Sequence, residues 1–294
     1  MTKNTLAHLT LTMVSIVYGA NYVIIKIVSP SHMGPSGLVL IRTVMAVAFF
    51  WIAGLFLKNA KKIEKQDWSK IVLCSICGAA FNQLTFFQGA VNTSPIDASL
   101  IMTSNPIIVL IFASVLLKEK LTKMKLVGIA LGCIGAVFII MQKEGENTSS
   151  SLYGNTMIFV NSILFGLYVV LVKPLITKYD TITLMKWIFL FGLLMLIPFG
   201  YNETLAVDWD SFDNTIWWAF IYSSAIVTFL AYVPNILALR WVSSALVSSY
   251  LYVQPLIAAA LAMLWLDESL SFSAIFAAIL IFIGVYLVGK ESKA

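Results

Sequence analysis

Charged side chains are scarce in this sequence: Asp, Glu, Lys and Arg make up only 11% of its 294 residues, whereas 60% are hydrophobic. A soluble domain carries roughly 25% charged residues. So few charges cannot cover a surface that faces water, and we infer a protein of the lipid bilayer. Histidine is nearly absent, with two residues, and no histidine or carboxylate falls deep inside an apolar run. An intramembrane enzyme would need such groups, so we expect no enzymatic activity.

Cysteine is limited to three residues, Cys74, Cys77 and Cys133. The first two form a CxxC inside an apolar run, but redox or metal chemistry needs exposed thiolates and further ligands, and none stands nearby. We therefore expect apolar packing residues, without a metal or a cofactor. A nucleotide site is also lacking, because "GVYLVGK" (284–290) is followed by Glu291 where a Walker A motif needs Ser or Thr.

Long apolar runs dominate what is present. Each is close to the roughly 20 residues that a membrane-spanning helix needs, and none shows the alternating pattern of a transmembrane strand. Because helices satisfy their own backbone hydrogen bonds in lipid, we predict an all-α integral membrane protein with ten transmembrane helices. The predicted spans are residues 6–28, 36–57, 70–91, 97–117, 124–141, 153–175, 181–200, 215–239, 243–266 and 272–289.

Lysine and arginine are distributed unevenly over the short connections between these runs. Alternate connections contain only Lys143, and the others hold most of the basic residues. Since basic loops stay in the cytoplasm, we predict that both termini are cytoplasmic. Basic residues so placed are topology signals, so we expect no nucleic-acid partner. The basic connections contain Lys58, Lys61, Lys62, Lys65, Lys70, Lys118, Lys120, Lys123, Lys125, Lys178, Arg240, Lys290 and Lys293.

The two halves of the sequence repeat one pattern of residues. An offset of 149 positions relates Pro106 to Pro255, Glu119 to Glu268 and Gly135 to Gly284, and an offset of 147 relates Gly19 to Gly166. Each copy would hold five helices, an odd number, so the second copy must cross the membrane in the opposite sense. We therefore predict two inverted five-helix repeats, over residues 1–142 and 153–290, an arrangement that recurs in secondary transporters.

Several stretches resemble one known family. They are "YGANYVIIK" (18–26), Arg42, the two repeated prolines and "LLKEKLTKMKLVGIALGCIGAVFI" (116–139). Together they resemble the EamA-type branch of the drug/metabolite transporter superfamily. The resemblance implies ten helices, a pseudo-twofold axis in the membrane plane, a central cavity and the export or exchange of small metabolites. Tyr18 departs from the pattern, because many relatives have tryptophan before the first-helix glycine.

Two prolines near mid-membrane mark a candidate substrate site. Pro106 and Pro255 each remove a helix hydrogen bond, and each follows a side-chain amide, Asn105 or Gln254. A kink with a free carbonyl and an amide at the bilayer centre suits a substrate site and a hinge. Alternatively, the amide satisfies the backbone that the proline disturbs. Pro234 predicts a third hinge.

Other polar residues inside the spans are also candidates, because burying them in lipid is costly. Lys26 and Arg42 lie near the outer ends of their helices, where a cation would attract a substrate carboxylate. Alternatively, their long side chains reach the headgroups and the charge does nothing else. The remaining candidate substrate-binding residues are Asn21, Asn82, Gln83, Tyr168, Tyr232, Asn235 and Tyr250.

These features predict a secondary transporter in the inner membrane of a bacterium. We expect an exporter, facilitator or exchanger that moves amino-acid-like or other small amphipathic metabolites by alternating access, with a lipid flippase or channel-like permease as the alternative. Gly128 and Gly132 form a GxxxG that predicts close helix packing, within the fold or in a homodimer. The bilayer and a small-molecule substrate are the other expected partners.

Overall fold

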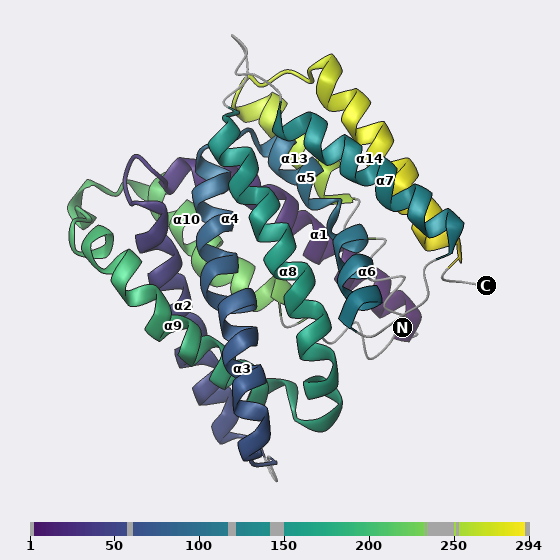
Figure 1. Ribbon diagram of the computed structural model, residues 1–294. Coiled ribbons are helices and arrows are strands. Elements are labelled where there is room, and N and C mark those ends of the chain that lie inside the picture. The colour runs from purple at the N-terminus through teal and green to yellow at the C-terminus, as the bar shows by residue number, and fades with distance from the viewer. Residues whose placement is uncertain are drawn as a thin grey trace.

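The computed structural model describes residues 3–57, 61–116, 122–141, 150–232, 234, 250 and 253–291. Every regular element in this part of the chain is a helix, as predicted. The long helices lie side by side along one direction (Figure 1). Their bounds are α1 Lys3–Val28, α2 Pro35–Leu55, η1 Lys65–Asp67, α3 Trp68–Ser75, η2 Ile76–Ala80, α4 Phe81–Val91, α5 Pro95–Met102, α6 Asn105–Leu116, α7 Lys123–Ile140, α8 Leu152–Lys178, α9 Thr181–Leu205, η3 Trp209–Ser211, α10 Asn214–Ile221, η4 Tyr222–Tyr232, α13 Val253–Trp265 and α14 Phe272–Glu291.

Seven helical segments are long and apolar enough to cross a membrane. They coincide with the first seven predicted spans, with boundaries that shift by a few residues. The chain adds two shorter apolar helices, Val253–Trp265 and Phe272–Leu287, within the last two predicted spans. Residues 235–249, at the end of the predicted eighth span and the start of the ninth, lie outside the described residues, so ten crossings remain a prediction.

The fourth span is broken where a kink was predicted. Helix α5 ends at Met102 and α6 begins at Asn105, so the chain leaves helical geometry just before Pro106. A proline inside a continuous helix would clash with the carbonyl four residues earlier, whereas at the start of a new helix it is tolerated. The sequence located the disturbance correctly, but the result is two short helices.

The third helix of each repeat contains a π-helical segment. In the first repeat this is η2, Ile76–Ala80, between α3 and α4, and in the second it is η4, Tyr222–Tyr232, after α10. An offset of 149 positions maps residues 76–80 onto 225–229, inside η4. Such wide turns are rare and occur often at functional sites. Their equivalent positions indicate that they belong to the repeated design.

Two antiparallel pairs, α2 with α9 and α7 with α14, each join equivalent helices of the two repeats (Figure 1). In the second pair the backbones nearly touch. A Cβ on Gly284 would lie 2.5 Å from the carbonyl oxygen of Gly128 and 2.8 Å from the amide nitrogen of Gly132. Lipid tails are as apolar as leucine, so helices in a membrane associate through such close packing. The predicted GxxxG face therefore packs within the fold.

The first and fourth helices also pack across the two repeats. In α1, a Cβ on Gly19 would lie 2.8 Å from Cβ of Ile257 in α13, and in α8 a Cβ on Gly166 would lie 2.7 Å from Cγ2 of Ile108 in α6. Ile108 and Ile257 are 149 positions apart, and the two glycines are 147 apart. The first helix of each repeat therefore packs on the fourth helix of the other.

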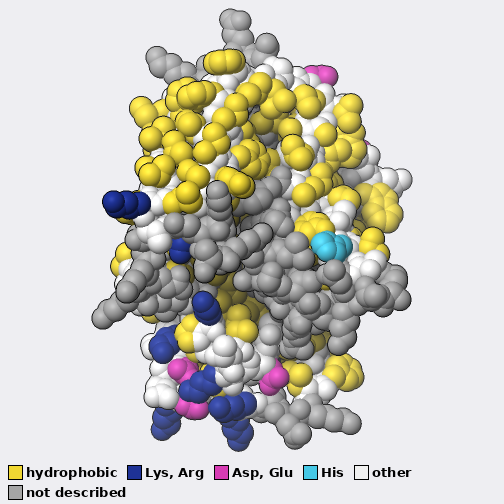
Figure 2. Space-filling view, turned by 90° about the vertical axis from the view of Figure 1, so that its right-hand side faces the viewer, with side chains coloured by type: hydrophobic (Ala, Val, Ile, Leu, Met, Phe, Trp, Pro, Cys, Tyr) yellow, Lys and Arg dark blue, Asp and Glu magenta, His cyan; other side chains and the backbone are white. Residues whose placement is uncertain are grey.

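The outer surface is apolar along the helices and basic at one end. On α14, the residues that face away from α7 are exposed, including Ile275, Ile279 and Ile283. Figure 2 shows hydrophobic side chains over the upper part of one face, with most of its lysine and arginine gathered at the lower end. Exposed apolar side chains over whole helices are expected where the surrounding solvent is lipid.

Candidate functional site

Helix α1 lies among elements of both repeats and contacts two of the predicted residues. The Oγ of Ser15 donates to the carbonyl of Tyr250 at 2.9 Å, and Nδ1 of His8 is 2.7 Å from the hydroxyl of Tyr250. The backbone of Gln254 passes α1 at Gly19. Further along α1, the phenol of Tyr22 donates to the sulfur of Met102 at the end of α5. Tyr250 and Gln254 therefore both lie against α1, the helix that carries Asn21.

The break between α5 and α6 leaves a buried amide open. The hydroxyl of Ser104 donates to the carbonyl of Ile101 at 2.6 Å, and the hydroxyl of Thr103 donates to Leu100. These hydroxyls satisfy two carbonyls at the end of α5. Oδ1 of Asn105 and Oδ1 of Asn21 are buried without a hydrogen-bond partner among the described residues. Both acceptors are therefore available to a ligand donor.

Arg42 points into the protein. Its Nε donates to Oγ1 of Thr228 in η4 at 3.0 Å, and its guanidinium lies 5.3 Å from the ring centroid of Phe87 in α4. Thr228 is 3% exposed. The side chain thus bridges helices α2, α4 and η4 and does not extend to the headgroups, as the alternative reading of the sequence assumed.

Two further predicted residues lie in contacts between helices. Nδ2 of Asn82 donates to the carbonyl of Asn161 at 3.1 Å, and Nδ2 of Asn161 returns the bond to the carbonyl of Asn82 at 2.7 Å. The ring of Tyr168 lies directly over Gly78 in η2 and leaves no room there for a Cβ. These residues join α8 to the third span. Gln83, beside them in sequence, is half-buried.

A buried polar group, here called the carboxylate cluster, was missed by the sequence analysis. It comprises Lys26, Asp97, Ser150 and Glu268. Asp97 and Glu268 are 3% and 9% exposed, and both interact electrostatically with Lys26. The hydroxyl of Ser150 donates to Oδ2 of Asp97 at 2.5 Å. The sequence placed Asp97 and Glu268 correctly at helix ends, but burial there depends on segments that meet only in the fold.

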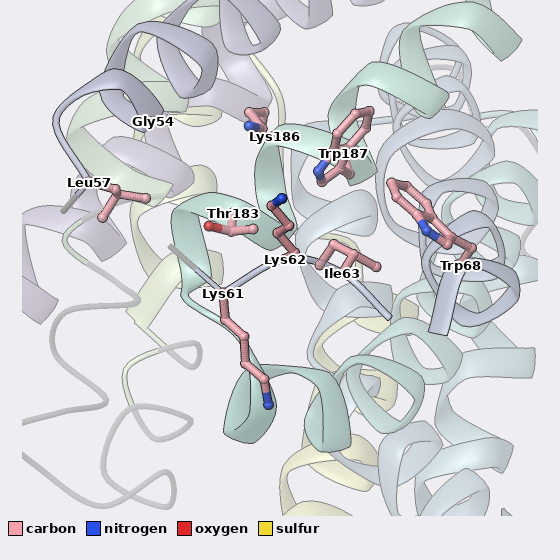
Figure 3. Close-up of a pocket in the computed structure, with 9 residues that line it drawn as sticks. All are labelled: Gly54, Leu57, Lys61, Lys62, Ile63, Trp68, Thr183, Lys186 and Trp187. Carbon is pink, nitrogen blue, oxygen red and sulfur yellow. The ribbon is translucent and has the colours of Figure 1, made fainter. Parts of the chain in front are cut away.

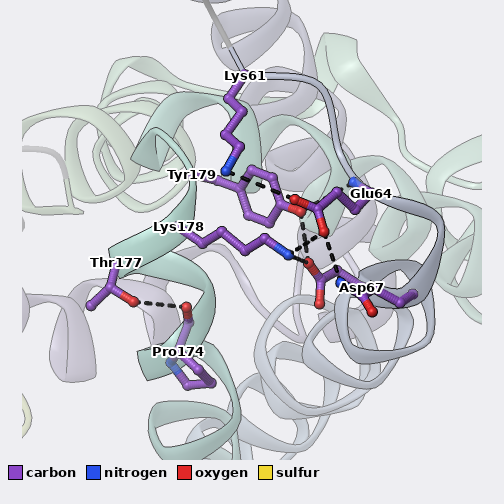
Figure 4. Close-up of polar contacts among 8 residues, drawn as sticks. Lys61, Glu64, Asp67, Pro174, Thr177, Lys178 and Tyr179 are labelled. Atoms are coloured by element: carbon purple, nitrogen blue, oxygen red, sulfur yellow. Dashed lines mark hydrogen bonds and ion pairs between the residues drawn. The ribbon is translucent and has the colours of Figure 1, made fainter.

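A second polar group, the lysine network, lies at the other end of α8 (Figure 4). It comprises Glu64, Asp67, Lys178 and Tyr179. Nζ of Lys178 lies 2.6 Å from Oε2 of Glu64 and 2.6 Å from Oδ2 of Asp67, which also accepts a hydrogen bond from the Tyr179 hydroxyl at 2.6 Å. The hydrogen bond from Lys178 holds the pKa of the Glu64 carboxyl below its usual value. This contact therefore adds stability above that usual pKa and is lost as the pH falls through the lowered value.

The two polar groups stand at opposite ends of one helix. Ser150 precedes α8 and Lys178 is its last residue, so 27 residues at 1.5 Å each separate them by roughly 40 Å. That distance matches the thickness of a bilayer with its headgroups. The acceptors of Asn21 and Asn105, unpaired within the described part of the chain, lie between the two ends. The molecule therefore has a polar centre, with the carboxylate cluster at one end and the lysine network at the other.

Some predictions fall at the edge of what the structure describes. Asn235 and the side chain of Tyr232 lie outside the described residues, and Pro234 is half-buried between undescribed neighbours. Pro255 is the third residue of α13. Cys74 and Cys77 are buried, as expected of packing residues, and no group of three or more metal-ligating side chains occurs among the described residues.

Known proteins resemble this chain along most of its length. Residues 5–141 and 152–290 each match the EamA-like transporter family. An "Uncharacterized transporter" of Archaeoglobus fulgidus is 26% identical over 97% of both chains. The "Uncharacterized transporter YyaM" of Bacillus subtilis is 29% identical over 77% of this chain and 73% of its own. A WAT1-related protein of Arabidopsis thaliana is 25% identical over 96% and 85%. A solved crystal structure shares the fold, with a TM-score of 0.62, 16% identity and 99% coverage of each chain.

Proposed function

Because the chain belongs to the EamA-like transporter family, we propose that it is a secondary transporter that carries small organic metabolites across a bacterial inner membrane by alternating access. The substrates would be amino-acid-like or other small amphipathic solutes. The open acceptors of Asn21 and Asn105 suit ammonium, amide or hydroxyl donors. The apolar surroundings, with Tyr22 and Phe86 in edge contact at 5.7 Å, suit a hydrophobic part of the same solute.

The main support for this proposal is that the first helix of each repeat packs on the fourth helix of the other. Contacts group the central helices into two bundles, α3, α4 and α6 with α8, and α1 with η4 and α13, while α5 contacts both. Each bundle mixes elements of both repeats, which favours moving bodies other than the two halves of the sequence. We propose that these mixed bundles rock against each other, with the π-helical segments and the break before Pro106 as hinges.

The lysine network and the carboxylate cluster would act as alternating gates. The lysine network joins the segment before α3 to the end of α8, and the carboxylate cluster joins the ends of α1 and α13 to the start of α5. Opening one side would require separating the charges there while the other side stays closed. The buried carboxylates also give the protein titratable groups for ion coupling, so a facilitator or exchanger is not the only mode that the fold supports.

A counterflow experiment tests the transport function. Purified protein in liposomes loaded with an unlabelled amino acid, amine or nucleoside is expected to accumulate the labelled form of its own substrate, with saturation. Saturable counterflow identifies a carrier, because a channel does not couple the two fluxes. Redistribution of labelled lipid between leaflets, without counterflow of any solute, would instead favour a flippase.

Cysteine labelling tests the opposite orientation of the repeats. Thr122 and Ser271, 149 positions apart, cap α7 and α14 by accepting backbone hydrogen bonds from Lys125 and Ala274. Since α7 and α14 are antiparallel, these caps lie at opposite ends of the pair. In a Cys133→Ser background, we expect an impermeant maleimide to label Ser271→Cys in intact cells, and Thr122→Cys only after permeabilisation. Labelling of both positions in intact cells would contradict the inverted topology.

A further inference from the structure

A cavity of about 350 Å³ opens between the end of α2 and the start of α9, next to the segment that carries Glu64. Its volume is that of a pocket for a small ligand. None of its residues belongs to the polar centre of the molecule, to the carboxylate cluster or to the lysine network. The cavity is lined by Gly54, Leu57, Lys61, Lys62, Ile63, Trp68, Thr183, Lys186 and Trp187.

Two lysines give the cavity an uncompensated positive charge. Lys61 pairs with Glu64 at 3.8 Å and extends away from the other residues, whereas Lys62 points toward Thr183 and Lys186 (Figure 3). Within the described part of the chain, no carboxylate lies within ion-pair distance of Lys62 or Lys186. Two neighbouring ammonium groups without an acid attract an anion, and phosphate is a common partner of lysine.

Tryptophans surround one of these charges. Nζ of Lys186 lies 4.6 Å from the ring centroid of Trp51 and 5.4 Å from that of Trp187. Trp187 in turn meets Trp68 edge to face at 4.9 Å. The cation–π contacts hold the ammonium at the rim of the cavity, and tryptophan is enriched at the depth of lipid headgroups. The cavity therefore combines a fixed cation with a ring type that belongs to the membrane interface.

The surface beside the cavity is apolar. Along the end of α2, Ile52, Leu55 and Phe56 have 58%, 81% and 80% of their surface exposed. Helix α2 packs against α9 at the edge of the molecule (Figure 1). A ligand seated in the cavity would therefore meet charge and tryptophan at one end and an exposed apolar helix at the other. This arrangement matches a phospholipid: the charged cavity suits its headgroup and the exposed apolar face of α2 suits its acyl chains.

We propose that this cavity binds the phosphate group of an anionic phospholipid from the adjacent leaflet. Lys62 and Lys186 contact the phosphate, Trp51 and Trp187 hold Lys186 in place, and the acyl chains lie along the exposed face of α2. The basic connections that define the cytoplasmic side in the sequence include Lys61 and Lys62, so the leaflet is the cytoplasmic one, where anionic lipids attract lysine.

Native mass spectrometry of the purified full chain tests this site. The protein is titrated with short-chain phosphatidylglycerol, with phosphatidylcholine and with inorganic phosphate. Each lysine near an anionic lipid contributes about a fivefold gain in affinity. We therefore expect Lys62→Gln/Lys186→Gln to bind phosphatidylglycerol about 25-fold more weakly. The double variant Lys70→Gln/Lys123→Gln removes the same charge at exposed positions outside the cavity and should bind as the wild type does.

The arms of this titration separate the possible results. Preference for phosphatidylglycerol over both other ligands, lost only in the cavity variant, supports the site. Equal binding by both double variants would overturn it, because the effect would then be net charge alone. Inorganic phosphate that binds as tightly as the lipid would overturn the lipid as the ligand. The single variant Lys62→Gln, at an exposed side chain, guards against loss through misfolding and should weaken binding about fivefold.

Discussion

Transport by the double variant Asn105→Leu/Gln254→Leu is expected to fall about 25-fold while its folded state remains intact. Both amides are buried, and Oδ1 of Asn105 is open to a ligand. A hydrogen bond between a neutral pair contributes about 1 kcal/mol, which corresponds to roughly fivefold for each amide removed. The initial rate of counterflow in liposomes measures the loss.

Stability separates this site effect from simple damage. Replacing a buried polar group that lacks a partner by an apolar one removes a desolvation cost, so thermal unfolding of Asn105→Leu should occur at the wild-type temperature or above it. Asn202→Leu changes an exposed amide near the end of α9 and is the matched control, with transport unchanged. Native transport by a normally folded double variant would remove both residues from the site.

Gly284→Val is expected to destabilise the protein by about 3 kcal/mol or more. Its Cβ would meet backbone atoms of Gly128 and Gly132 at 2.5 and 2.8 Å, and backbone in a helix cannot rotate away as a side chain can. Overpacking typically costs about 1–3 kcal/mol and more where the neighbours cannot move. The helices α7 and α14 would then have to separate along their length. Thermal unfolding in detergent, followed by tryptophan fluorescence, measures the change.

Gly54 provides the matched control for this substitution. A Cβ there would meet only Cδ of Lys186, at an ordinary 3.6 Å. Alanine is also the better helix former by about 1 kcal/mol, so Gly54→Ala should be neutral or slightly stabilising. If Gly284→Val unfolded at the same temperature as Gly54→Ala, the close contact between α7 and α14 would be wrong.

Hydropathy and charge predicted much of the fold. The first seven spans and the buried Cys74 and Cys77 were evident, because lipid imposes length and composition on every helix that crosses it. The offset between Pro106 and Pro255 also located the break in the fourth span. Neither the π-helical segments nor the packing of each repeat's first helix on the other repeat's fourth helix could be predicted. Both depend on which surfaces meet, and no local residue pattern specifies that.

The candidate site was predicted less completely. Asn105 and Arg42 do face the interior, because a proline or a charge within an apolar run is costly unless the fold uses it. Asn82 instead lies in a reciprocal amide contact with Asn161, a pairing that sequence cannot distinguish from a ligand contact. Asp97 was expected at a helix end, but its burial could not be predicted, since that burial depends on segments more than fifty positions away.

The packing of helices across the two repeats also bears on how such a chain arose. One five-helix half, alone, would leave the small-residue faces of its first and fifth helices without the surfaces that cover them here. A second copy inserted upside down supplies both surfaces at once, because Gly19 meets Ile257 in the same way that Gly166 meets Ile108. Gene duplication and fusion would then have joined an assembly of two separate subunits that already worked together.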